Sequence, residues 1–248
     1  MSYIEAYKNS INKLISELSD RPYKEAGEIL ADTIEHGGLV HIVGTGIHSS
    51  MSAEDMFFRT GALVVVNPLF DPTLSVTHSA AKAFYMKNAP DLGTFLMEYY
   101  RNISAGDAII IVDNEGIGTI PYEIIKWSSE KELKIIVVTS IDYANSIDKE
   151  NCYRNPERIN ITDMDVSLVI DNKVPINDTA VILSNGMQSG WVSTIANSFI
   201  LNMVTLSTIE CLEDRGIKCD LWHDFITTEG CNRNESFIDK YYERIRHI

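Results

Sequence analysis

The segment from residue 38 to residue 61 constrains the fold of this chain more than any other. It begins with a short apolar, β-branched run, breaks at a stretch rich in glycine and hydroxyl groups at 44–50, and continues with helical periodicity. This order predicts a strand, a loop and a helix. Because such a loop lies at the carboxyl end of its strand, where open α/β sheets bind ligands, we expect a binding site there.

Four more apolar runs follow, at 63–66, 108–112, 134–138 and 166–170, and helical segments separate them. Strands that alternate with helices predict a parallel, doubly wound α/β sheet of five strands. The first 37 residues predict two amphipathic helices, with the break at Pro22, as a helical hairpin or cap ahead of the first strand. The chain of 248 residues is long enough for one large core, so we expect a single domain with a cap at 1–37 and a core at 38–248.

Further elements can be predicted from local signals. We expect helices from Pro90 through Tyr100, from about Pro121 to Ser129, over 191–212 and from about Asn234 to the end of the chain. The segment 73–86 is ambiguous, and residues 173–190 predict a long loop that contains Asn185–Gly186.

The charge and the cysteines limit the function classes. A formal net charge of −14 should repel nucleic acid and anionic membranes, so we expect neither as a partner. The four cysteines have no zinc-type spacing, no secretory signal precedes them, and no apolar run approaches the length of a membrane span. We therefore expect reduced thiols, a cytoplasmic location, no metal and no cofactor.

Two nucleotide motifs fail at the loop after the first strand. A dinucleotide fingerprint needs a third glycine where Ser49 stands, and a P-loop needs a lysine that the loop lacks. Two interpretations of the loop stay open. It is a cradle for an anion or a polyol, with Ser49 and Ser50 as donors beside a helix N-terminus, or it is an ordinary strand-to-helix turn capped by a serine.

Taken together, the motifs resemble those of sugar isomerase (SIS) domains, and in particular bacterial SIS-domain proteins with a long N-terminal helical cap. The resemblance covers nearly the whole chain. The matching motifs are His41 to Ser49, Ala53 to Gly61, Asn67-Pro68, Asp71-Pro72, Thr139-Ser140, Asp171-Asn172 and Ser193-Thr194.

The resemblance implies a flavodoxin-like, three-layer α-β-α sandwich and a homodimer or higher assembly. It also implies a phosphosugar or related carbohydrate ligand at the carboxyl ends of the strands, near a subunit interface. The family includes aldose–ketose isomerases, an etherase of N-acetylmuramic acid 6-phosphate, and sensing domains of regulators. The matching ligand-binding positions are Gly44, Thr45, Gly46, Ser49, Ser50, Asp113, Asn114, Glu115, Thr139 and Ser140.

The second ligand loop departs from the family pattern, which usually carries hydroxyl donors and a cation. Here Asp113 and Glu115 replace the hydroxyls, and Ile117 stands where a cation is usual. Because an ionised carboxylate donates no hydrogen bond and repels a phosphate dianion, three explanations arise. Phosphate binds only the first loop and Thr139-Ser140, or the ligand is unphosphorylated or an amino sugar, or the site is degenerate and the protein serves as a partner subunit.

Catalysis of aldose–ketose isomerisation needs a base and a group that polarises the carbonyl. Glu54, early in the helix after the first loop, is the candidate base, and partial burial would raise its pKa. His48 is the candidate polariser or acid. Each also has a structural interpretation, as a helix-dipole partner and as a turn residue. His41, inside a strand, is expected to be a core histidine. The alternative to an enzyme is a non-catalytic, sugar-sensing SIS domain.

Overall fold

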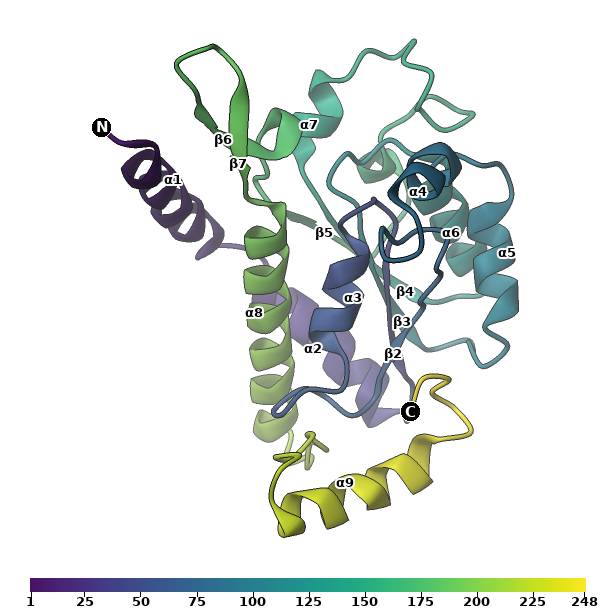
Figure 1. Ribbon diagram of the computed structural model, residues 1–248. Coiled ribbons are helices and arrows are strands. Elements are labelled where there is room, and N and C mark those ends of the chain that lie inside the picture. The colour runs from purple at the N-terminus through teal and green to yellow at the C-terminus, as the bar shows by residue number, and fades with distance from the viewer.

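The structure is a computed structural model that describes all residues 1–248. Its centre is a five-stranded, entirely parallel sheet in the order β2-β1-β3-β4-β5. The strands are β1 (Val40–Gly44), β2 (Val66–Pro68), β3 (Ala108–Val112), β4 (Lys134–Thr139) and β5 (Leu168–Asp171). Both faces of the sheet are covered by helices (Figure 1), which is why β1 and β3 are buried along their whole length.

The side chains of the strands alternate between two cores. Ile42 and Ile110 join the core that includes residues of α2 (Tyr23–Glu35), α3 (Ser50–Met56) and α8 (Ser193–Asp214). Val43 and Ile111 join the other core, with α5 (Leu92–Tyr99) and α6 (Thr119–Glu130). The predicted three-layer α-β-α sandwich with a five-stranded parallel sheet is therefore confirmed.

Both N-terminal helices contact α8, but their other neighbours differ. Helix α2 lies along α8, whereas α1 (Tyr3–Leu18) lies against a small hairpin of β6 (Thr179–Ile182) and β7 (Gln188–Trp191) (Figure 1). The hydroxyl of Tyr7 donates to the carbonyl of Trp191 at 2.8 Å. By length and composition alone, helix α8 could cross a membrane. This is weak evidence for a membrane span, because α8 packs against α2 and core helices meet the same criteria.

Except for α9 (Thr228–Tyr241), which has 14 residues, the remaining elements are short and lie near the carboxyl edge of the sheet. They are α4 (Ala80–Met86), α7 (Ile141–Ser146), α9 and two 3₁₀ turns, Ile161–Asp163 and Ile176–Asp178. Of these, α9 lies instead at the opposite end of the molecule, below α8 (Figure 1).

The second strand begins later than the sequence predicts. Residues 63–65 are buried, but the backbone of this segment bonds to the chain near Trp222, through Gly61 N–H to the Trp222 carbonyl at 2.8 Å and Val64 N–H to the Asp220 carbonyl at 3.0 Å. Strand pairing with β1 begins only at Val66, opposite Val40. An apolar run shows burial but does not show which segment supplies its hydrogen-bond partners.

Three other predictions need correction. The loop predicted over 173–190 contains the β6–β7 hairpin, which turns at Asn185–Gly186 with Gly186 at a positive φ of 81°. Helix α3 ends at Met56 because the backbone of Phe57 is extended, with φ −106° and ψ 139°, and Phe58 follows in a left-handed conformation, with φ 51°. Helix α9 begins at Thr228, capped by the Thr227 hydroxyl, and ends at Tyr241.

The prediction that His41 is a core histidine is confirmed. Its ring is fully buried, with Nε2 3.0 Å from an Asp107 oxygen and Nδ1 3.0 Å from the Asn67 amide nitrogen. Burial alone would raise the pKa of Asp107. Hydrogen bonds from His41 and from the backbone N–H groups of Leu39 and Ser104 outweigh burial and lower that pKa.

Candidate functional site

The loops that follow β1, β3 and β4 meet at one edge of the sheet because these strands are parallel neighbours. The backbone N–H of Thr45 donates to the Val112 carbonyl at 3.1 Å, and its hydroxyl donates to Asp113 at 2.7 Å. These bonds fix the first loop to the second at the ends of β1 and β3.

The first loop has no room for a side chain at Gly44 and little room for one at Gly46. A Cβ at Gly44 would lie 1.9 Å from the Ser49 carbonyl oxygen, and a Cβ at Gly46 would lie 3.0 Å from the Ser49 hydroxyl. The backbone N–H of Ser49 donates to the Gly46 carbonyl at 3.1 Å, which closes the turn ahead of α3. Gly44 therefore stands where the backbone of the loop approaches itself too closely for any other residue.

Asn114 connects four elements around the second loop. Its amide nitrogen donates to the Ser49 hydroxyl at 3.5 Å, and its backbone carbonyl accepts from the Ser140 N–H at 3.3 Å. Its amide oxygen accepts from Asn172 at 2.9 Å and from Asn197 at 3.0 Å. Asn172 follows β5 and Asn197 lies in α8, so Asn114 joins both to the first loop and to the end of β4.

Asp113 uses both of its oxygens inside the protein. One oxygen accepts from the Thr45 hydroxyl and the other from the Gly116 N–H at 2.7 Å, and the residue is 5% exposed. Asp113, which stands where the family usually has a hydroxyl donor, therefore connects the first loop to the second and stabilises both.

Glu115, in contrast to Asp113, forms an ion pair with a lysine. Its carboxylate lies 3.3 Å from Nζ of Lys87, just after α4. Burial and the negative charge of Asp113 raise the pKa of Glu115, against the opposite effect of Lys87. The same group of charges affects Tyr143, whose pKa is raised by burial and by Glu115.

The polar pair at the end of β4 is fully buried. The Ser140 hydroxyl donates to the Val174 carbonyl at 2.7 Å and accepts from the Tyr143 N–H at 3.3 Å, which caps α7. The Thr139 hydroxyl has no hydrogen-bond partner and lies against Gly116, where a Cβ would be 2.6 Å away. Thr139 is the unsatisfied polar group of this site.

A cavity of about 140 Å³ opens beside the first loop, between α3 and the segment that follows β2. Its lining includes Gly44, Ser50 and Glu54 on one side and residues 69–72, Leu74, Ser75 and Thr77 on the other. The cavity therefore adjoins the predicted Asn-Pro and Asp-Pro segment. It brings Ser50 and Glu54 to one wall.

Neither predicted catalytic residue is buried. Glu54 and His48 are both exposed, so the partial burial expected for Glu54 is wrong. Glu54 lies on the outward side of α3, because the buried side of this short helix is formed by Ser52, Ala53 and Met56. No group of three or more His, Cys, Asp or Glu side chains is placed to hold a metal ion.

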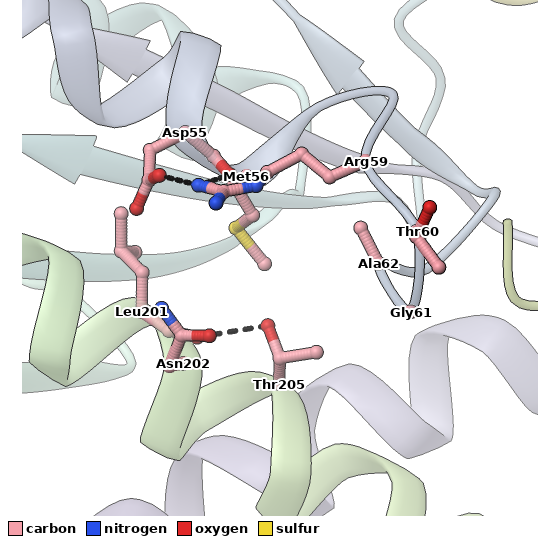
Figure 2. A pocket seen from close by; sticks show the side chains of 9 residues that line it. All are labelled: Asp55, Met56, Arg59, Thr60, Gly61, Ala62, Leu201, Asn202 and Thr205. Carbon is pink, nitrogen blue, oxygen red and sulfur yellow. Dashed lines mark hydrogen bonds and ion pairs between the residues drawn. The ribbon is translucent and has the colours of Figure 1, made fainter. Parts of the chain in front are cut away.

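A second cavity, of about 160 Å³, lies between the end of α3 and the middle of α8 and contains none of the predicted site residues. Figure 2 shows its lining, with the ion pair of Asp55 and Arg59 on one side and Asn202 and Thr205 of α8 on the other. Arg59 is thus paired within its own segment, away from the strand ends.

Sequence reasoning missed three residues of this region. Asn197 lies four residues after Ser193, one turn into α8, and helical spacing from that motif was the available signal. Lys87 comes directly after the segment 73–86 that the sequence left ambiguous, and no local signal singled it out. Asp178 accepts from the N–H groups of Val192 and Ser193 at 3.1 and 2.7 Å, so the start of α8 is capped from within the chain.

Comparisons with known proteins show the family to which the chain belongs. The SIS domain family matches residues 2–140. A UPF0309 protein of Shouchella clausii is 27% identical over the full length of both chains, and a UPF0309 protein of Listeria innocua is 27% identical over 98% of this chain and 96% of its own. The solved phosphoheptose isomerase of Neisseria gonorrhoeae aligns over 82% of this chain and 94% of its own, at 14% identity and a TM-score of 0.46. Since the family match covers more than half of the sequence, the chain belongs to the SIS domain family.

Proposed function

We propose that this protein binds a phosphosugar or a closely related carbohydrate derivative and converts it, as a sugar or sugar-phosphate isomerase. Membership in the SIS domain family supports the ligand class. The structure supports the location, at the carboxyl ends of β1, β3 and β4.

The observation that carries the proposal is the convergence of the predicted loops on Asn114. Ser49, Ser140 and Asn197 all bond to this residue, and the cavity of about 140 Å³ begins at Gly44 of the first loop. A polar network that holds three loops rigid beside a cavity is the arrangement expected of a site for a small polyol.

The proposed chemistry is a proton transfer between C1 and C2 of the sugar. Glu54 lies in the cavity wall and is the proposed base, because a carboxylate there reaches a ligand without moving the loop. His48, exposed in the first loop, is the proposed acid or carbonyl polariser. Both roles rest on position and residue type.

One observation favours the second candidate, a non-catalytic sugar-sensing domain. Glu54 and His48 are both exposed, whereas a catalytic base is usually held by burial and by neighbours that tune its pKa. Under this alternative the same loops bind the sugar and release it unchanged.

We also propose a homo-oligomer and a cytoplasmic location. Support for assembly comes from exposed apolar side chains on and near the β6–β7 hairpin, with Ile182 72%, Met187 64% and Trp191 69% exposed. Exposed apolar clusters of this kind are typical of protein interfaces. Light scattering after size-exclusion chromatography tests the assembly.

A thermal-shift screen of matched sugars and sugar phosphates, amino sugars included, tests the ligand class, because a ligand that binds the native state raises its melting temperature. Turnover of any protective sugar by the wild type and by Glu54→Gln then tests catalysis. The enzyme hypothesis predicts that Glu54→Gln binds but does not convert, whereas Glu210→Gln, an exposed control on α8, behaves as the wild type. Equal turnover in both variants would contradict the role of Glu54, and no turnover by the wild type would favour the sensing domain.

A further inference from the structure

The end of α4 reaches the second ligand loop. Lys87 lies 3.3 Å from Glu115, and the amide oxygen of Asn88 accepts from the Thr119 N–H of α6 at 3.4 Å. These two contacts place the end of α4 over the start of α6. The amide nitrogen of Asn88 is buried and has no partner, so the junction has an unused donor.

Aromatic rings hold the Lys87 side chain in place. Nζ lies 4.6 Å from the ring centre of Tyr153 and 5.7 Å from that of Phe84. The Lys87 side chain is only 16% exposed. Lys82, on the same helix, is exposed and forms no ion pair, which makes it a matched control. Cation–π contacts and an ion pair together orient a lysine that would otherwise be mobile.

Lys87 brings positive charge to the second loop, which lacks the hydroxyl donors that the family usually has there. Asp113 is occupied by Thr45 and Gly116, so its charge already has partners. Glu115 has the Lys87 ammonium as its partner, and its side chain is 43% exposed. A half-exposed carboxylate can turn into solvent at little cost, which would free Lys87 for another anion.

We propose that Lys87 and Glu115 together set the charge selectivity of the site: Lys87 receives the anionic group of the ligand, and Glu115 competes for the same ammonium. The inference rests on the proposed function and deepens it. The substrate class is an anionic sugar derivative, a sugar phosphate or a sugar acid. An amino sugar without an anionic group is disfavoured, since its ammonium would meet Lys87.

The test measures the affinity of the wild type and four variants by calorimetric titration. The probes are glucosamine 6-phosphate, fructose 6-phosphate and gluconate, with glucosamine and fructose as the uncharged or cationic counterparts. Glu115 competes with the ligand for Lys87 with the strength of a surface ion pair. Without this competitor, Glu115→Gln should bind an anionic probe about 2- to 5-fold more tightly. Losing a charged hydrogen bond predicts that Lys87→Gln binds it about 10- to 100-fold more weakly. Lys87→Arg should restore most of the affinity, and Lys82→Gln should match the wild type.

The outcomes separate this inference from the proposed function. If an anionic probe binds the wild type but Lys87→Gln and Glu115→Gln leave its affinity unchanged, the inference fails and the proposed function stands. If only glucosamine or fructose binds, the inference fails while carbohydrate binding stands. If no probe binds the wild type or Glu115→Gln, both proposals are contradicted. Circular dichroism of each variant confirms that it is folded.

Discussion

The amide nitrogen of Asn197 donates to the amide oxygen of Asn114 at 3.0 Å, which joins α8 directly to the second ligand loop. Asn172 donates to the same oxygen and also to the amide oxygen of Asn197, at 2.9 Å each. Asn172 and Asn197 are almost completely buried. The three amides form a closed network in which removal of one member leaves buried polar groups unpaired.

Replacement of Asn197 should therefore destabilise the protein and loosen the site. We expect Asn197→Ala to lower the free energy of unfolding by about 1–3 kcal/mol, the usual cost of an unsatisfied buried polar group. Urea denaturation measures this difference. Asn202→Ala, an exposed position on the same helix, should change the free energy by less than about 0.5 kcal/mol. Equal effects at the two positions would argue against the network.

A methyl group at Gly44 should disrupt the first loop. Its Cβ would lie 1.9 Å from the Ser49 carbonyl, so backbone must move. Gly46→Ala is the matched variant, because its Cβ would meet only the Ser49 hydroxyl at 3.0 Å. We expect Gly44→Ala to abolish the thermal protection given by a sugar ligand and Gly46→Ala to reduce it. If Gly44→Ala retains full protection, the loop does not form the binding site.

Asp107 should contribute to stability at neutral pH and lose that contribution in acid. Its pKa is lowered in the folded state, so the contribution is full above the unfolded pKa near 4 and is lost as the pH falls through the folded pKa. We expect Asp107→Asn to lower the free energy of unfolding by about 1–3 kcal/mol at pH 7 and by less at pH 3. Asp165→Asn, an exposed control, should show no such pH dependence.

Glu115 should have the opposite pH dependence. Its pKa is raised by burial and by Asp113, so the folded state favours the protonated form, and stability is lost as the pH rises from the unfolded pKa through the folded pKa. We expect Glu115→Gln to melt at a higher temperature than the wild type at pH 8, with a smaller difference at pH 4. The effect should stay below about 1 kcal/mol, because the side chain is 43% exposed and solvent screens it. A lower melting temperature at pH 8 would show that the Lys87 ion pair outweighs the burial of Glu115.

Much of the fold could be predicted because local signals and packing agree. The run at 108–112 is buried on both faces and pairs on both sides, so its composition suffices to place a central strand. The start of β2 could not be predicted, because Gly61 and Val64, just ahead of it, bond to Trp222 and Asp220 instead, about 160 residues later in the chain. The β6–β7 hairpin had a turn signal at Asn185–Gly186, but its strands have only four residues each.

The sequence predicts which loops meet at the edge of the sheet, but it does not predict the direction of their side chains. Strand-end loops place Thr45, Asp113 and Ser140 at one edge of the sheet. The sequence does not show that Asp113 faces Thr45 and Gly116, or that Lys87 reaches Glu115. The contact of Lys87 with Glu115 depends on the path of 69–87, a stretch with few periodic signals.

Hydrogen–deuterium exchange with and without a protective sugar phosphate tests the central claim most directly, because it locates the ligand on the chain. If the ligand binds at the carboxyl ends of β1, β3 and β4, backbone amides at 44–50 and 114–116 should exchange more slowly in its presence. Protection confined to residues 59–62 and 201–205, around the cavity between α3 and α8, would contradict the account.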